Sequence, residues 1–93
     1  MKIPAHASKG TMKKPKLYQR VALRQNWPEA GLRRGDLATV TEIVPHPADG
    51  EDGCVLEIFS ALGESLRVAT VPLSLVEPLA VDDIPSLRRL VVA

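Results

Sequence analysis

Leu32-Arg33-Arg34-Gly35-Asp36-Leu37-Ala38-Thr39-Val40-Thr41-Glu42-Ile43-Val44 is the stretch that decides the fold of this chain. Gly35 reaches a positive φ easily and Asp36 can hydrogen-bond to its own backbone, so the first part predicts a tight turn. The residues from Leu37 to Val44 are rich in β-branched side chains and predict a long strand. Apolar residues occupy both faces of a regular strand here, so we expect a β-bulge that bends the strand and helps the sheet to close into a small barrel.

Four more segments have the length and composition of short strands. They are Leu17–Leu23, Cys54–Phe59, Glu64–Val71 and Glu77–Leu79. Pro45–Gly53 is rich in turn formers and predicts an exposed hairpin loop, Pro72 ends a strand, and Leu73–Val76 suits one helical turn. Five short strands at this spacing predict an all-β fold, a small SH3-like barrel that occupies residues 17–79 as one domain.

The interior of this barrel is predicted to be aliphatic, because the chain is 45% apolar but has only three aromatic residues. On the first strand we expect Leu23 to face inward together with either Tyr18 or Val21, because the residues alternate in character. The same alternation places Cys54, Leu56 and Ile58 on the inner face of the third strand. Trp27 and Leu32 are the apolar anchors expected to fold the long loop after the first strand over one end of the barrel.

The cysteine content and the distribution of apolar residues indicate the cellular compartment. Cys54 is the only cysteine, so an internal disulfide and a cysteine-rich zinc site are excluded. No run approaches the roughly 20 apolar residues that a membrane-spanning helix needs. The basic N-terminus is not followed by an apolar segment, as a secretory signal would be. These features predict a cytoplasmic protein with no membrane association.

The charge of the chain is divided unevenly. Residues 1–20 hold six of the twelve basic residues and no acidic residue, whereas residues 21–93 hold the other six with all eleven acidic residues. Residues 1–16 show no periodicity and little apolar content, which predicts a disordered basic arm. A start at Met12 would leave the folded part intact, so residues 1–11 are expected to be dispensable.

The C-terminal segment, residues 80–93, differs from the strands. Ser86 could cap a short helix in which Leu87, Leu90 and Val91 form one apolar face. A helix this short needs a surface to dock on, so the tail is expected to be either a short helix or extended.

The ordered residues resemble a bacterial family known as the domain-of-unknown-function family numbered 4926. The glycine that usually follows its Gly-Asp turn is Ala38 here, and the aromatic residue of its third strand is Ile58. The resemblance implies an SH3-like barrel and no particular activity. The matching residues are Val21-Ala22-Leu23, Pro28, Gly31-Leu32-Arg33-Arg34-Gly35-Asp36, Thr39-Val40, Leu56-Glu57-Ile58 and Val76-Glu77-Pro78-Leu79.

Residues with catalytic or metal-binding potential are few and scattered. His6 lies in the arm and His46 in the hairpin loop, whereas Cys54 is expected to be a core residue, so no Cys–His pair is predicted. The loop carries Asp49, Glu51 and Asp52 beside His46, but their spacing fits no known ligand set, so the loop is interpreted as solvated. No cofactor is expected, because the glycines are isolated and form no phosphate-binding loop.

The carboxylates give no stronger signal for an enzyme. Asp36 and Glu57 are the most plausible pair for acid–base work, but Glu57 is expected to pair across the strands with Arg67 instead. Arg33 and Arg34 are interpreted first as a solvated turn and second as a recognition site. We therefore predict that the protein is not an enzyme.

Two functions remain. The preferred one is a protein-interaction module that binds a partner chain, or a second copy of itself, through its barrel edges, loops or C-terminal tail. The alternative is an accessory nucleic-acid-binding protein whose arm neutralises phosphates. The candidate partner-binding residues are Trp27, Arg33, Arg34, Leu87, Leu90 and Val91. The candidate nucleic-acid residues are Lys13, Lys14, Lys16 and Arg20.

Overall fold

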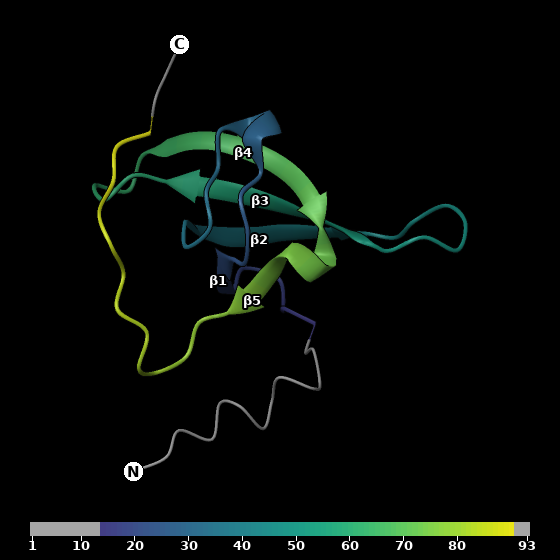
Figure 1. The fold of residues 1–93 in the computed structure, drawn as a ribbon. Helices are drawn as coiled ribbons and strands as arrows, with labels where there is room; N and C mark the ends of the chain where they lie inside the picture. The colour runs from purple at the N-terminus through teal and green to yellow at the C-terminus, as the bar shows by residue number, and fades with distance from the viewer. Residues whose placement is uncertain (1–13, 91–93) are drawn as a thin grey trace.

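The computed structural model of the chain describes residues 14–90. Five strands make up almost all of its regular structure (Figure 1). They are β1 (Arg20–Leu23), β2 (Leu37–Val44), β3 (Gly53–Phe59), β4 (Ser65–Pro72) and β5 (Val76–Pro78). Two three-residue 3-10 helices, η2 (Pro28–Ala30) and η3 (Leu73–Leu75), precede β2 and β5 respectively. The predicted arm lies outside the described residues except for Lys14, Pro15 and Lys16.

The strands form one antiparallel sheet in the order β4-β3-β2-β1-β5. The predicted all-β fold is therefore confirmed, and its five strands are arranged as in a small SH3-like barrel. The sheet is not closed, in contrast to the closed barrel that the sequence predicts. It leaves β4 and β5 as edge strands, and β4 bends strongly over the rest of the sheet (Figure 1).

The predicted bulge lies in β2. Val40 pairs with Leu56, but the next pair joins Glu42 to Val55, so Thr41 is the extra residue. Its hydroxyl donates a hydrogen bond to the carbonyl oxygen of Val55 at 3.2 Å. The bulge changes the parity of the strand, and this change lets apolar residues on both sides of it pack against the same core.

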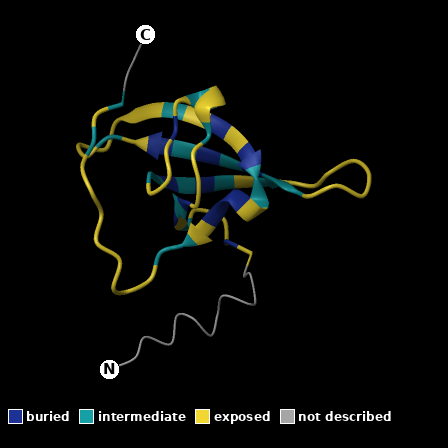
Figure 2. Cartoon of the chain, in the orientation of Figure 1, coloured by how far each residue is buried: buried dark blue, intermediate teal, exposed yellow. Residues whose placement is uncertain are grey.

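The core is aliphatic, as predicted, and lies on the inner side of the curved sheet (Figure 2). Val21 and Leu23 face inward on β1, whereas Tyr18 is 74% exposed, so Val21 and not Tyr18 is the inward partner. Buried and less buried residues alternate along β3. The buried side chains are Val21, Leu23, Leu32, Ala38, Val40, Cys54, Leu56, Ile58, Ala69, Val71, Leu75 and Val76.

The loop between β1 and β2 is held over one end of the sheet. Trp27 and Leu32 exchange backbone hydrogen bonds of 2.9 and 3.0 Å, and Leu32 is buried while Trp27 packs against the core. On the inner side of β4, Nη1 of Arg67 donates to the carbonyl oxygen of Ala30 at 2.6 Å. Gly31 takes a left-handed conformation at φ +69° to end η2. The loop is therefore a packed part of the fold.

Gly31 provides a test of this arrangement. In Gly31→Ala the new Cβ would lie 2.9 Å from Nη1 of Arg67, and the alanine would have to adopt a left-handed φ. We expect the free energy of unfolding to fall by about 2 kcal/mol, of which about 1 kcal/mol comes from the backbone. Denaturant unfolding should show a smaller penalty for the same change in an Arg67→Ala background. Equal penalties in the two backgrounds would mean that the guanidinium does not restrict this position.

Candidate functional site

The C-terminal segment forms a strap, which we define as residues 80–90, that leaves β5 and returns to the loop between β1 and β2. Its first turn is closed by hydrogen bonds between Ala80 and Asp83, and no regular secondary structure follows. The short helix capped by Ser86 is therefore wrong, and the extended alternative for the tail is correct. A lone helix of this length has too few internal hydrogen bonds to persist, and contacts of Arg88 fix the strap instead.

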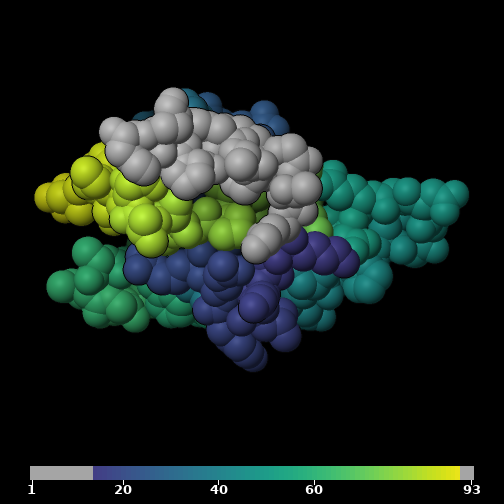
Figure 3. Space-filling model, turned by 90° about the horizontal axis from the view of Figure 1, so that it is seen from below, coloured from purple at the N-terminus to yellow at the C-terminus, as the bar shows by residue number. Residues whose placement is uncertain are grey.

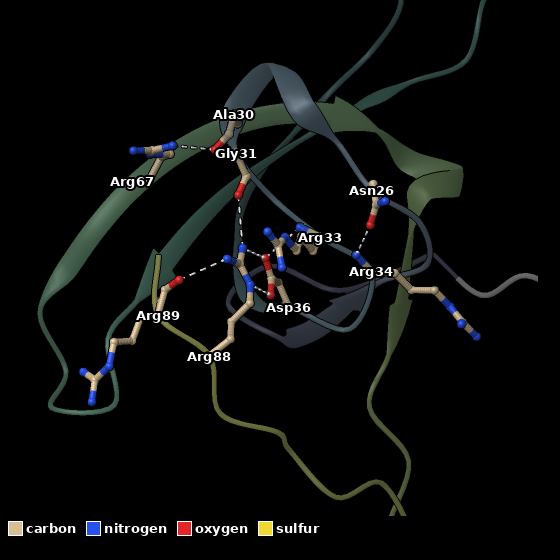
Figure 4. Close-up of polar contacts among 9 residues, drawn as sticks. All are labelled: Asn26, Ala30, Gly31, Arg33, Arg34, Asp36, Arg67, Arg88 and Arg89. Carbon is tan, nitrogen blue, oxygen red and sulfur yellow. Dashed lines mark hydrogen bonds and ion pairs between the residues drawn. The ribbon is translucent and has the colours of Figure 1, made fainter. Parts of the chain in front are cut away.

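Arg88 joins the strap to the loop (Figure 4). Its Nε donates to Oδ1 of Asp36 at 2.8 Å and its Nη2 to Oδ2 at 2.5 Å, which makes the pair bidentate. The same Nη2 donates to the carbonyl oxygen of Gly31 at 3.0 Å. Oδ2 of Asp36 also accepts the backbone N–H of Arg33 at 2.8 Å, which closes the predicted turn. One carboxylate thus stabilises the turn and the strap together.

The electrostatics of this pair favour the charged forms. Burial alone would raise the pKa of Asp36, but the hydrogen bonds from Arg88 and Arg33, and their charges, outweigh it and lower the pKa. The hydrogen bond and the charge of Asp36 raise the pKa of Arg88. Bidentate guanidinium–carboxylate pairs combine charge with fixed geometry, so this contact specifies where the strap lies.

A groove of about 470 Å³ separates the strap from the sheet. Residues of β1, β2 and β5 form its floor, whereas Asp83, Ile84 and Pro85 of the strap form its outer wall. The apolar strap side chains Val81, Ile84 and Leu87 are exposed, and Leu87 is 83% exposed. The strap therefore covers the groove without burying its own apolar side chains.

The second candidate surface is the free edge of β4. Among the described residues, the backbone of Ser65–Pro72 makes no hydrogen bond beyond its ladder with β3. On the outer face of this edge Val68 is 60% exposed, and Leu66 and the neighbouring Phe59 are each 43% exposed. The edge therefore combines unpaired backbone groups with apolar side chains.

The predicted partner-binding residues are divided between the core, the turn before β2 and the strap, and none of them belongs to β4. Trp27 is partly buried and packs against the core, so its side chain contributes to folding more than to a binding surface. Arg33 and Arg34 are exposed beside Asp36, and Arg34 lines the groove. Leu87 is exposed and Leu90 is half-buried, both on the strap, whereas Val91 lies outside the described residues. The structure thus brings Arg33, Arg34 and the strap to one end of the fold.

The predicted nucleic-acid residues lie just before and within β1. Lys13 is outside the described residues, whereas Lys16 and Arg20 are exposed. The amine of Lys14 lies 3.7 Å from Oδ2 of Asp52 in the hairpin loop, and its side chain is 69% exposed. Tyr18 adjoins these cations in the sequence and is exposed, which was one of the two alternatives that the alternation along the first strand left open.

The remaining candidates have structural roles. The thiol of Cys54 is buried, and desolvation raises its pKa to about 11, which disfavours the reactive thiolate. Nδ1 of His46 accepts the backbone N–H groups of Ala48 and Gly50 at 3.0 and 3.2 Å and so closes the hairpin loop. Within residues 14–90, no three His, Cys, Asp or Glu side chains are placed to hold a metal ion.

The expected pair of Glu57 with Arg67 does not form. Glu57 lies on the outer face of β3 opposite Val68 and accepts a hydrogen bond from the hydroxyl of Ser65 at 2.6 Å. Arg67 has the opposite parity, because it pairs with the inward-facing Ile58, and its guanidinium binds Ala30. Asp36 is bound to Arg88 instead of being joined with Glu57.

Comparison of the chain with protein-family models, with curated proteins and with solved structures finds no significant match. The resemblance to the family numbered 4926 therefore stays a prediction from its motifs. In the part of the chain that the structure describes, no helix is both long and apolar enough to span a bilayer.

Proposed function

We propose that this chain is a non-enzymatic protein-interaction module that accepts an extended segment of a partner protein as an additional strand beside β4. The observation that carries the proposal is the eight-residue edge strand, whose outer backbone groups have no partner among residues 14–90. Long, apolar edge strands are templates for strand addition. Backbone hydrogen bonds would supply affinity, and the side chains beside the edge would supply specificity.

The chemistry of the edge defines the partner segment. Leu66 and Val68 lie on the outer face of β4, and Phe59 is exposed on the neighbouring strand. The only charged side chain of β4, Arg67, points to the inner face and is engaged by Ala30. A segment with apolar residues at alternate positions therefore fits this edge best.

The strap offers an additional contact surface for the same partner. Its exposed Val81, Ile84 and Leu87 gain no burial from their own sheet. Burial of the only cysteine as a free thiol is compatible with a reducing compartment, and we place the module in the cytoplasm on this ground.

The test compares two valine-to-lysine variants of the full chain. Val68→Lys puts a charge beside the free edge, whereas Val44→Lys puts the same charge on the outer face of β2, an interior strand. Affinity capture from the native cell should retain a partner on the wild type and on Val44→Lys, and should lose it on Val68→Lys. The captured partner should then slow hydrogen exchange of the β4 amides, because strand addition protects them.

Retention of the same partner by both variants, with unchanged exchange at β4, would contradict strand addition. A second copy of the chain is the other candidate for the edge. It would be identified if light scattering gave about twice the monomer mass for the wild type and the monomer mass for Val68→Lys. A captured partner that dissociates only when the strap residues are changed would assign the binding to the strap.

A further inference from the structure

Tyr18 has a backbone conformation that is unusual for a residue with a large side chain. It is the one described non-glycine residue with a positive φ, at +66°, and the residue is 74% exposed. A bulky side chain is unfavourable in this region of backbone space, where glycine or asparagine is the usual choice. Packing does not offset the cost of this conformation, because most of the residue faces solvent. A strained residue that contributes little to the core points to a role outside folding.

Hydrogen bonds on both sides hold Tyr18 in this conformation. Its backbone N–H donates to the carbonyl oxygen of Val40 at 2.5 Å, and the N–H of Gln19 donates to the carbonyl oxygen of Lys16 at 3.1 Å. The side chain of Gln19 closes the same turn by accepting the N–H of Lys16 at 2.8 Å. The turn is therefore fixed against β2 and presents the ring at a defined place.

In the sequence, cations flank Tyr18 at every second position. Lys14, Lys16, Tyr18 and Arg20 are all exposed, and we call these four residues the basic ridge. In the view of Figure 3, the purple residues at the start of the described chain project from the body. The cross-strand neighbour of Arg20 on β2 is the neutral Thr39. Of the three cations of the ridge, only Lys14 forms an ion pair with an acidic residue among residues 14–90, at 3.7 Å from Asp52.

We propose that the basic ridge binds single-stranded nucleic acid, with Tyr18 stacking on a base and the three cations contacting the flanking phosphates. An exposed aromatic ring between cations is the combination that single-strand-binding surfaces use without sequence preference. The bases of a duplex are already stacked on one another, so the ring favours unpaired strands. A protein partner is less suited to the ridge, because protein interfaces need an apolar centre that the ridge lacks.

The test measures anisotropy of a fluorescein-labelled oligothymidine and of an oligouridine, each of about 20 nucleotides, with the full chain at about 50 mM salt. Three phosphate contacts should give a slope of log K against log salt of about −2. Tyr18→Gly should weaken binding at least about tenfold, because stacking is lost. The same variant should be at least as resistant to denaturant as the wild type, because glycine tolerates the positive φ. Tyr18→Phe should bind like the wild type.

Matched controls separate the ridge from the rest of the molecule. Phe59→Gly removes another exposed aromatic ring, and Arg33→Gln with Arg89→Gln removes two exposed cations elsewhere, so both variants should bind normally. Lys16→Gln with Arg20→Gln should reduce the salt slope by about 1.4. A labelled duplex of the same length should bind more weakly than either single strand.

Several results would overturn the proposal. They are the absence of binding at low salt, unchanged binding by Tyr18→Gly, equal affinity for duplex and single strands, and loss of binding when only Lys2, Lys9 and Lys13 are changed to Gln. The outcome is independent of the edge of β4, because Val68→Lys should leave oligonucleotide binding unchanged.

Discussion

Replacing Leu56 with alanine is expected to lower the free energy of unfolding by about 3 kcal/mol. Leu56 is fully buried on β3, where it lies between Val40 of β2 and Ala69 of β4 in the sheet register. Leucine-to-alanine changes in cores cost about 2–5 kcal/mol, because apolar burial is lost and the cavity collapses only in part. Small domains are often stable by only about 5 kcal/mol, so the variant should be close to unfolding at ambient temperature.

Leu62→Ala is the matched control, because Leu62 is 91% exposed at the turn between β3 and β4. Urea unfolding followed by circular dichroism should show a change within about 0.5 kcal/mol for the control. A penalty for Leu56→Ala that is no larger than that of the control would mean that this face of β3 is not the core.

Asp36→Ala is expected to lower the free energy of unfolding by about 2 kcal/mol and to release the strap. Asp36 accepts hydrogen bonds from Nε and Nη2 of Arg88 and from the backbone N–H of Arg33, and its side chain is only 15% exposed. Hydrogen bonds to charged groups contribute about 1.5–3 kcal/mol when buried, and partial exposure of Arg88 reduces this value. Arg88→Ala should cost about 1 kcal/mol, since Asp36 keeps its bond to the turn.

Limited proteolysis within the strap should be faster in both variants, whereas hydrogen exchange of the β3 amides should not change. Asp82→Ala changes an exposed acid of the strap and should leave stability within about 0.5 kcal/mol of the wild type. The double variant of Asp36 and Arg88 should lose less than the sum of the single changes, because they share one contact. Strict additivity would show that the two side chains do not interact in solution.

The same pair should make stability depend on pH in the acid range. The pKa of Asp36 is lower in the folded protein than in the unfolded chain, so the folded state binds the proton less well. Its contribution is therefore complete above the ordinary carboxyl pKa of about 4 and is lost as the pH falls through the lower folded value. Asp36→Ala should unfold with a weaker acid dependence than the wild type.

The parts of the fold that follow local rules were predictable from the sequence. Alternation identified the inward residues of β3, glycine and aspartate marked the turn at Gly35 and Asp36, and Pro72 marked the end of β4. The bulge in β2 was predictable because its apolar residues change parity. These features depend on residues that are close in the sequence, so they can be predicted without knowledge of the tertiary structure.

The candidate surfaces were less predictable, because they depend on contacts between distant residues. Arg88 and Asp36 are 52 positions apart, and no periodicity identifies them as partners. The arginine of β4 was assigned to Glu57 because they lie on neighbouring strands, but the register places them on opposite faces. The positive φ of Tyr18 is imposed by hydrogen bonds to β2, and its own side chain gives no sign of it.

The side-chain contacts that hold the loop between β1 and β2 to β4 and to the strap are made by guanidinium groups, from Arg67 to Ala30 and from Arg88 to Asp36 and Gly31. Every lysine of the chain, in contrast, stands at or before position 16. Acetylation or an amine-reactive dye would therefore remove or cap charges only ahead of β1 and leave those contacts intact. The protein can therefore be tethered to a sensor through its amines while the edge of β4 and the strap stay unmodified. The same coupling would remove the positive charges of Lys14 and Lys16 in the basic ridge.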